Sequence, residues 1–405
     1  MTPAGSPSTV PQSEILAVPA ARGACPFDPP PAYAQARDRA AITPIRLWDG
    51  STTWMLTRHA DVRAVLADRR FSADAGRPGF PFVSAGRRTL ATTNASFIRM
   101  DDPEHARLRK MLTGDFIVKR AEALRPRIRA IAQDLLAAMT AGRDHADLVT
   151  EFALPLPSLV ICLLLGVPYE DHAYFQQRSG ILLSNAASAA EIQTARAELT
   201  RYIKRLAEDK RDRDEDDIIS RLNRQGTLSA DEIAAMSLLL LVAGHETTAN
   251  MTSLSILALL QNPDQLARLR ADPALIRGAV EELLRYLTIV HTGVARVATE
   301  DVDLDGRRIR AGEGVLLMIN AANRDDRAFP EPDALDVERD ARRHLAFGFG
   351  VHQCLGQPLA RVELQVALEV LLSGLPGLRL AVPVEDVPFR HDMLVYGVHT
   401  LPIAW

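Results

Sequence analysis

The sequence has few cysteines, no long apolar run and no excess of positive charge, and each of these features excludes a class of protein. Its three cysteines are too few for a disulfide framework, so each thiol needs its own explanation. The apolar runs fall short of the ~18–20 residues that span a bilayer. The formal net charge of −4 argues against nucleic acid as a general partner, because phosphate binding needs a basic surface.

The amino-terminal part also lacks the features of a targeting segment. No Lys or Arg precedes Arg22, so the basic region and apolar core of a signal peptide are missing. We therefore expect a cytoplasmic protein with no membrane partner.

What remains is the composition of a globular protein. Apolar residues make up 47% and charged residues 24% of the 405 positions, which is enough for a large buried core. No Gly/Ser linker, repeat or low-complexity block divides the chain. The sequence predicts one large domain over residues 26–405, preceded by a loose arm, residues 1–25, that is rich in Pro, Ser and Ala.

Helical spacing of apolar residues dominates from Glu104 onward and predicts a mainly α fold with small β-sheets. The clearest strands are Val302–Leu304 and Arg308–Arg310, which flank an Asp-Gly dipeptide suited to a tight hairpin. Another strand is expected at Trp54–Thr57, after the turn residues Asp49 and Gly50. Asp102, Pro103 and Glu104 are typical of the capped start of a helix.

The most informative stretch is Phe-Gly-Phe-Gly-Val-His-Gln-Cys-Leu-Gly-Gln-Pro, residues 347–358. Its glycines permit tight turns and leave room for a flat ligand. Cys354 stands at the start of a helix, where amide groups and the dipole stabilise a thiolate that can bind metal. By contrast, Cys162 lies in an apolar stretch and is interpreted as a core residue, and Cys25 as an incidental thiol.

Three other interpretations of this loop remain open from the residues alone. Cys354 could be an ordinary loop cysteine at a helix start. It could be the nucleophile of a thiol hydrolase, with His352 nearby, although no third member is evident. The spacing of Gly348 and Gly350 also matches part of a dinucleotide fingerprint, but Gln353 replaces the third glycine.

The pattern Phe-x-x-Gly-x-His-x-Cys-x-Gly resembles the haem-binding loop of the cytochrome P-450 superfamily. The resemblance extends from about residue 25 to Trp405 and is closest to soluble bacterial, actinomycete-type members. It implies a haem b whose iron is held by Cys354 as thiolate, because such a ligand favours O–O cleavage. It also implies a monomeric monooxygenase.

Two sets of charged residues gain roles from this resemblance. Glu282 and Arg285 are spaced to pair on one helix face, which is typical of a surface ion pair, but in the family this pair and an arginine matching Arg339 support the cysteine loop. His105 and Arg109 lie at i and i+4, and with residues matching Arg296 and His352 the family uses them to hold the haem propionates.

A long apolar helix from Asp231 to about Gln261 supplies the predicted chemistry. Residues 244–248 interrupt its pattern, and a bond from the Thr247 hydroxyl to the carbonyl of Ala243 is expected to distort it. The segment resembles the acid–alcohol motif of the family, in which Glu246 and Thr247 deliver protons to dioxygen. His245 is expected to face away from the iron.

Four apolar segments are predicted to form the substrate pocket. They are residues 78–98, expected to be a mobile lid without helical period, residues 239–247, residues 289–294, and the pair Leu394 and Val395. The named pocket residues are Val242, Ala243, Val294, Leu394 and Val395.

The resemblance implies that the enzyme hydroxylates a bulky hydrophobic molecule, a natural product or xenobiotic, with O2. No flavin or NADPH-binding stretch is evident, so electrons are expected from a ferredoxin with its reductase. Docking of that partner is predicted on a basic face made by Arg107, Lys110, Arg342, Arg343 and Arg361.

Two rival functions stay open. The nitric oxide reductase branch of the family shares stretches such as residues 47–51 and 151–155, but Glu246 favours oxygen activation. A non-catalytic haem sensor needs Cys354 and no acid–alcohol pair.

Overall fold

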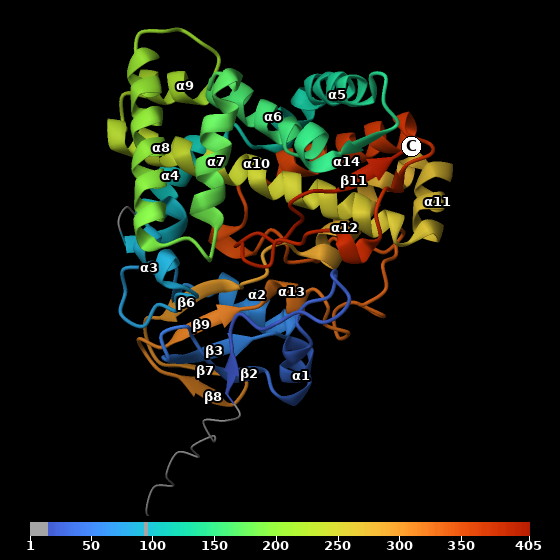
Figure 1. Ribbon diagram of the computed structural model, residues 1–405. Helices are drawn as coiled ribbons and strands as arrows, with labels where there is room; N and C mark the ends of the chain where they lie inside the picture. Colours follow the sequence, from blue (N-terminus) through green and yellow to red (C-terminus); the bar gives the residue numbers. More distant parts are fainter. Residues whose placement is uncertain (1–14, 93–95) are drawn as a thin grey trace, which may run out of the picture.

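A computed structural model describes residues 15–92 and 96–405. Helices fill the upper part of the molecule and a six-stranded sheet the lower part, and α10 runs through the middle (Figure 1). The fourteen α-helices among these residues are α1 (Pro31–Arg39), α2 (His59–Ala67), α3 (Ala85–Thr92), α4 (Glu104–Thr113), α5 (Val118–Thr140), α6 (Pro155–Leu165), α7 (His172–Leu183), α8 (Ala189–Asp209), α9 (Ile218–Gln225), α10 (Ala230–Leu260), α11 (Pro263–Ala271), α12 (Ile276–Leu287), α13 (Ile319–Ala322) and α14 (Gln357–Gly374).

The strands form three small sheets. Those of the described residues are β1 (Leu16–Ala17), β2 (Ile42–Arg46), β3 (Thr52–Leu56), β4 (Phe71–Ser72), β5 (His145–Asp147), β6 (Val294–Ala298), β7 (Val302–Leu304), β8 (Arg307–Ile309), β9 (Gly314–Leu317), β10 (Arg379–Leu380) and β11 (Pro402–Ala404). The largest sheet has the order β1-β2-β3-β9-β6-β4, a second sheet has β10-β11-β5, and β7 pairs with β8. The predicted fold class, mainly α with small β-sheets, is confirmed.

The locally encoded elements agree with the sequence. Asp305 and Gly306 both have positive φ, at 47° and 74°, in the turn between β7 and β8, as the predicted hairpin requires. The predicted strand at Trp54–Thr57 is β3, and Gly50 in the preceding turn has φ 83°. The strand boundaries differ from those predicted by one or two residues.

Helix α10 is the centre of the helical part. Ser229 and Glu232 cap its start reciprocally, each side chain bonding the other residue's backbone amide. Helices α6, α8, α12 and α14 pack around it, so that the helix is buried on nearly all sides. In the described part of the chain, no helix has the length and apolar character needed to cross a membrane.

The structure corrects the prediction that residues 244–248 interrupt this helix, because α10 is continuous from Ala230 to Leu260. Gly244 has another role. A Cβ atom at this position would lie 2.9 Å from Cγ1 of Ile161, so the glycine permits close packing against α6.

Two further predictions about the amino-terminal third need correction. Residues 1–14 of the predicted loose arm lie outside the described residues, but residues 15–25 pack against the domain: Leu16 pairs with Ile45, and the Arg22 guanidinium lies 3.5 Å from the ring centre of Tyr396. The predicted lid, whose residues 93–95 also lie outside the described ranges, contains helix α3 although no helical period was expected.

The start of α4 also differs in detail. The carboxylate of Asp102 does not cap the helix; its Oδ1 lies 3.1 Å from Nδ1 of His105 instead. Asp102 therefore orients a side chain of the candidate site.

Candidate active site

The cysteine loop is shaped by its glycines and by the helix that follows. Gly348 and Gly350 have positive φ values of 69° and 73°, and a Cβ on Gly350 would lie 2.5 Å from the carbonyl oxygen of Leu66 in α2. The Cys354 amide donates to the carbonyl of Phe347 at 2.8 Å. The backbone amides of Gly356 and Gln357, at the start of α14, donate to the Cys354 thiol.

The Cys354 side chain is accessible, although protein atoms surround it. Its side chain is exposed, yet burial among protein atoms raises its pKa, and the amides with Arg109 and Arg361 only partly offset this effect. A thiol that is surrounded by protein but still accessible faces an open space inside the molecule. The amides at the start of α14 favour the thiolate, as the sequence predicts, although burial outweighs their effect on the pKa of the thiol.

The other two thiols lack this combination. Cys162 is 3% exposed in the core, where burial raises its pKa to about 12, as expected for an inert packing residue. Cys25 is exposed near the surface of the domain.

Helix α10 opens to the interior at the predicted acid–alcohol segment. Ala243 is exposed and Thr247 half-buried, although both lie in the middle of this otherwise buried helix. The Thr247 hydroxyl donates to the Ala243 carbonyl at 2.7 Å, as predicted. Both residues are thus accessible within the molecule, as Cys354 is.

Glu246 lies beside them and has a partner that no pattern in the sequence revealed. The residue is 4% exposed, and its carboxylate accepts a hydrogen bond from Arg390 at 3.0 Å. Asn250 connects the two residues, since its Nδ2 donates to the Glu246 carbonyl and its Oδ1 accepts from Arg390. Arg390 comes from an irregular segment 144 residues later and has no motif around it.

His245 belongs to the core. It is fully buried, its Nδ1 lies 2.6 Å from the Leu241 carbonyl, and its ring stands edge-on to Phe175. Burial lowers its pKa, so it is neutral at pH 7.

Three of the four predicted propionate ligands form one cluster, and the fourth lies beside it. The rings of His105 and His352 are 4.1 Å apart, and burial with the nearby charge of Arg296 lowers the pKa of His352 to about 3. Arg109, on the same helix as His105, donates to the Gln353 carbonyl at 2.6 Å, next to the cysteine. The structure therefore brings all four residues to the cysteine loop.

This cluster has buried polar atoms without partners among the described residues. His105 Nε2 and His352 Nδ1 are buried and make no hydrogen bond there. Arg296 is 7% exposed, and its guanidinium donates only to its neighbour, the Ala295 carbonyl, within the described ranges. Unpaired buried donors are costly. An anionic ligand such as a haem propionate satisfies them, so the residues present fit haem.

The pair of Glu282 and Arg285 is buried rather than on the surface. Both side chains are 0% exposed, with Nε of Arg285 at 2.7 Å from Oε2 of Glu282. Nε of Arg339 lies 3.2 Å from the other carboxylate oxygen. The alternative of a solvated surface pair is excluded for these residues.

The same group is connected to the cysteine loop through Asn323. Arg285 donates to the Asn323 carbonyl at 2.9 Å, the Asn323 side chain accepts from the Leu345 amide at 2.8 Å, and the Leu345 carbonyl accepts from Gly348. Asn323 and Leu345 thus connect the buried ion pair to the loop that carries Cys354.

Segments predicted to form the pocket lie side by side. Val290 pairs with Val395, the His291 Nε2 lies 2.6 Å from the Met393 carbonyl, and the Leu394 amide donates to the Leu183 carbonyl at the end of α7. Val242, Val294 and Leu394 are half-buried, but Val395 is 4% exposed. Val395 therefore belongs to the core rather than to an open surface.

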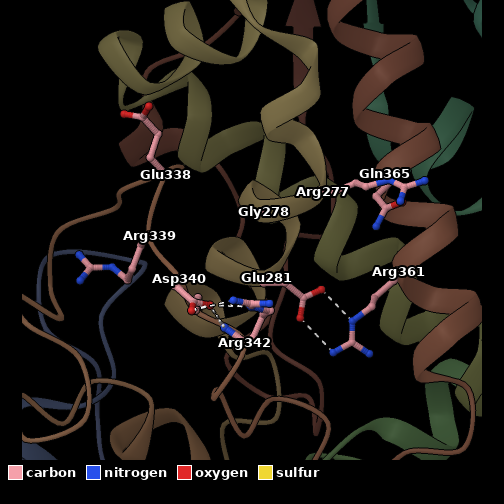
Figure 2. Close-up of a pocket in the computed structure, with 10 residues that line it drawn as sticks. Arg277, Gly278, Glu281, Glu338, Arg339, Asp340, Arg342, Arg361 and Gln365 are labelled. Carbon is pink, nitrogen blue, oxygen red and sulfur yellow. Dashed lines mark hydrogen bonds and ion pairs between the residues drawn. The ribbon is translucent and has the colours of Figure 1, made fainter.

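On the cysteine side of the molecule lies a surface cleft of about 610 Å³ between α12, α14 and residues 338–342. Figure 2 shows Glu281 paired with Arg361 and Asp340 with Arg342 at this cleft. Burial raises the pKa of Glu281, but His344 and Arg361 outweigh it and lower the value to about 2.

The basic docking face is therefore largely neutralised. Arg342 and Arg361 have acidic partners in the cleft, and Arg107 pairs with Glu104 and Glu232. These pairs reduce the positive charge of the predicted basic docking face, because each paired carboxylate cancels a charge, and docking there stays a prediction.

Sequence reasoning also missed charged residues that the structure buries, Glu363 and Arg87 among them. Glu363 on α14 is 2% exposed, and burial raises its pKa to about 8 although Thr248 donates a hydrogen bond to it. Arg87 is 7% exposed and Arg99 is half-buried, and burial lowers the pKa of each. A charged residue in the sequence carries no signal of its own burial.

Comparisons with known proteins agree with this geometry. Residues 176–376 match the family model for Cytochrome P450. Cytochrome P450-SU2 of Streptomyces griseolus is 66% identical over 97% of this chain and 98% of its own length. A vitamin D3 dihydroxylase of the same organism is 44% identical over 98% and 99%. The crystal structure of CYP105P1 in complex with filipin I has 41% identity and a TM-score of 0.91, covering 97% of this chain and 99% of that one.

Proposed function

We propose a specific reaction for this chain, which belongs to the cytochrome P450 family and is a monooxygenase. The reaction is hydroxylation of a bulky hydrophobic small molecule with O2 and with electrons from a ferredoxin. The observation that carries this proposal is the accessible Cys354 thiol inside the protein, beside buried donors that have no partner in the described chain. The family implies a haem cofactor, and the proposal specifies haem b.

The haem, when bound, supplies the iron on which dioxygen is activated, and a thiolate ligand favours cleavage of the O–O bond. In this chain Cys354 is the proposed metal ligand. His105, Arg109, Arg296 and His352 are proposed to hold the propionates, since they provide the unpaired donors and positive charge described above.

Glu282, Arg285 and Arg339 are proposed to fix the position of the cysteine loop. The hydrogen bonds from Arg285 to Asn323 and from Leu345 to Asn323 provide the connection. Rigid support of this kind lets the loop hold a ligand without reorganising.

The proposed catalytic residues hold and move protons. The Thr247 hydroxyl is anchored on the Ala243 carbonyl and accessible to the interior, so it can donate a hydrogen bond only by leaving that carbonyl. Glu246 is held by Arg390 at 3.0 Å; when this contact is broken, its carboxylate can take a proton from water and pass that proton to Thr247. Arg390 is thus a positioning residue for Glu246.

The substrate class rests on the pocket and on the relatives. Val242, Ala243, Val294 and Leu394 offer apolar surface that is not fully covered by protein. By their names, one relative hydroxylates vitamin D3 and one structure holds filipin I. Both observations support a large, mainly apolar substrate bound through buried area.

The remaining parts of the proposal concern the surroundings of the enzyme. A ferredoxin with its reductase supplies the electrons, and a monomer acts in the cytoplasm. Three free cysteines support a reducing compartment.

Reconstitution tests this function. The purified protein is screened for haem spectral shifts with hydrophobic compounds, and a compound that binds is then incubated with ferredoxin, reductase, NADPH and ¹⁸O2. We expect a hydroxylated product that contains one labelled oxygen atom. Reduction by ferredoxin without any product, across the binding compounds, contradicts the proposal and favours a haem sensor.

A further inference from the structure

Arg22 connects the amino-terminal arm to the carboxy-terminal end of the chain. Its guanidinium carbon lies 3.5 Å from the ring centre of Tyr396, a residue that is 1% exposed. The negative face of an aromatic ring attracts a cation, and this attraction is stronger where water is excluded. Nη1 of Arg22 also donates to the carbonyls of Pro26 and Asp28 at 3.2 and 2.6 Å. These bonds fix the orientation of the guanidinium over the ring.

The arm is anchored to the domain on both sides of Arg22. Before this residue, the Ala20 amide donates to the Tyr33 hydroxyl at 3.2 Å. After it, the carboxylate of Asp28 lies 3.2 Å from Nη1 of the buried Arg324. Because the chain is held on each side, the guanidinium of Arg22 is a fixed point against which the ring packs.

Tyr396 belongs to a hairpin formed by residues 389–398. The two arms of this hairpin are joined by a hydrogen bond of 2.9 Å from the Arg390 amide to the Gly397 carbonyl. The ring of Phe389, on the opposite arm, stacks on the Tyr396 ring with centres 5.9 Å apart and planes 9° apart. A contact that holds the Tyr396 ring therefore holds both arms of the hairpin.

The hairpin lies against the helix that carries the proposed catalytic residues. Gly397 follows Tyr396, and a Cβ atom on this glycine would lie 1.7 Å from Oδ1 of Asn250 on α10. The Asn250 side chain donates to the Glu246 carbonyl at 2.7 Å. Leu394, two residues before Tyr396, is half-buried and belongs to the proposed substrate pocket. A shift of the Tyr396 backbone thus displaces a residue of that pocket.

Packing rather than a hydrogen bond holds the Tyr396 side chain. Its hydroxyl is buried and has no hydrogen-bond partner among the described residues. The ring centres of His291, His391 and Phe389 lie 5.4, 5.6 and 5.9 Å from that of Tyr396. The guanidinium carbon of Arg22 is closer, at 3.5 Å, and it comes from the other end of the chain. Removal of Arg22 therefore leaves the ring with more freedom to move.

We propose that Arg22 is a positioning residue for substrate binding: its contact with Tyr396 fixes the hairpin of residues 389–398 and thereby the place of Leu394 in the pocket. This inference rests on the proposed function, which assigns Leu394 to the pocket. Without Arg22 the hairpin takes several positions, and a bulky ligand has to select one of them when it binds. A small ligand that does not reach Leu394 escapes this cost.

Two ligands of different size test this role in the haem-loaded full-length protein. Imidazole occupies only the immediate surroundings of the iron, whereas clotrimazole binds through the same ring and fills the pocket with its triphenylmethyl group. Dissociation constants are read from the spectral shift of nitrogen ligation. Arg22→Met removes the charge and keeps the length, so clotrimazole should bind about tenfold more weakly and imidazole within about twofold of the wild type.

The ratio of the two affinities decides the outcome. A ratio in Arg22→Met that equals that of the wild type overturns the proposal. A wild type that binds clotrimazole no more tightly than imidazole also overturns it, because no ordered pocket then surrounds the larger ligand. Loss of stability alone lowers Tm and haem content and affects the two ligands alike, so it leaves the ratio unchanged.

Arg39→Gln is the matched control. Arg39 is exposed at the end of α1 and makes no hydrogen bond or ion pair within the described part of the chain. The ratio of this variant should equal that of the wild type. A decrease as large as that of Arg22→Met shows a general effect of lost charge and contradicts the assignment to Arg22.

Variants of Tyr396 test whether Arg22 acts through this ring. Tyr396→Phe removes only the unpartnered hydroxyl and should behave as the wild type, whereas Tyr396→Leu should reproduce Arg22→Met. The double variant, Arg22→Met with Tyr396→Leu, should lose no more than either single variant, because both changes remove one interaction. Additive losses contradict the proposal.

A conservative variant covers the case in which Arg22→Met does not fold. Arg22→Lys keeps the cation but cannot lie over the ring and donate to Pro26 and Asp28 with one planar group. It should therefore show a ratio between those of the wild type and Tyr396→Leu. Full retention of the wild-type ratio contradicts the proposal.

Failure of this role differs from failure of the proposed function. A protein that shows the thiolate-type ferrous carbonyl band, and whose affinity ratio does not depend on Arg22, lacks the positioning role alone. A protein without that band fails the proposed function as well.

Discussion

Replacing Glu282 with Gln perturbs the buried ion pair with little change in shape. The carboxylate accepts from Nε and Nη2 of Arg285 at 2.7 and 2.8 Å, from Arg339 at 3.2 Å, and from the Asp336 amide at 3.0 Å. The amide of Gln keeps one acceptor and removes the negative charge. Arg285, which is 0% exposed, is then left as a buried cation without a counter-charge.

The expected loss of stability follows from this burial. Removing one partner of a buried pair costs ~3–5 kcal/mol. The entropy of unfolding is about 2.1 cal/mol/K per residue, or roughly 0.85 kcal/mol/K for 405 residues. Dividing the lost free energy by this entropy of unfolding predicts that Tm falls by about 4–6 °C.

Circular dichroism at 222 nm during heating measures this shift in the haem-loaded protein at neutral pH. Asp340→Asn is the control, because the side chains of Arg342 and Asp340 are 79% and 68% exposed and such solvent-exposed pairs contribute little to stability. We also expect Glu282→Gln to release haem faster, because the hydrogen bonds through Asn323 reach the cysteine loop. A Tm shift no larger than that of Asp340→Asn refutes the reasoning.

Three further predictions concern the thiol, the alcohol and a buried acid. Cys354→Ala should abolish the thiolate-type ferrous carbonyl band and Cys162→Ala should leave it; a band that survives in Cys354→Ala disproves the ligand. Thr247→Ala should keep substrate binding but lower product formed per NADPH, with peroxide rising, because general acid–base help is worth ~100-fold; unchanged coupling removes Thr247 from the mechanism. Burial raises the pKa of Glu363 to about 8. Between pH ~4.3 and 8 the folded state therefore holds a proton that the unfolded state releases, so that the free energy of unfolding falls by about 1.4 kcal/mol for each pH unit as pH rises. Because Glu363→Gln removes this pH dependence, the Tm of the variant relative to that of the wild type should rise as pH increases through this range. Parallel curves of Tm against pH for the two proteins would contradict this prediction.

Features that depend on a few neighbouring residues were determined by the sequence. The loop around Cys354 could be recognised because its glycines, its cysteine and the following helix start are adjacent, so backbone geometry alone shapes it. The hairpin at Asp305 and Gly306 is local in the same way. Helix α10 was identified by its composition and length.

Errors arose where distant segments meet. Gly244 was interpreted as a break in α10, but its role depends on Ile161 of α6, which packs against it. The predicted basic docking face loses positive charge to Glu232 and Glu281, which lie far from Arg107 and Arg361 in sequence.

Only the tertiary structure decided which charged side chains are buried and which residues they pair with. Glu246 and Arg390 are 144 residues apart, and no local pattern connects them. Arg87 is 7% exposed, yet nothing in its sequence neighbourhood indicates that its side chain is buried. The physical reason is that turns and helices follow from torsional preferences over a few residues, whereas desolvation and ion pairing depend on every segment that packs around a group.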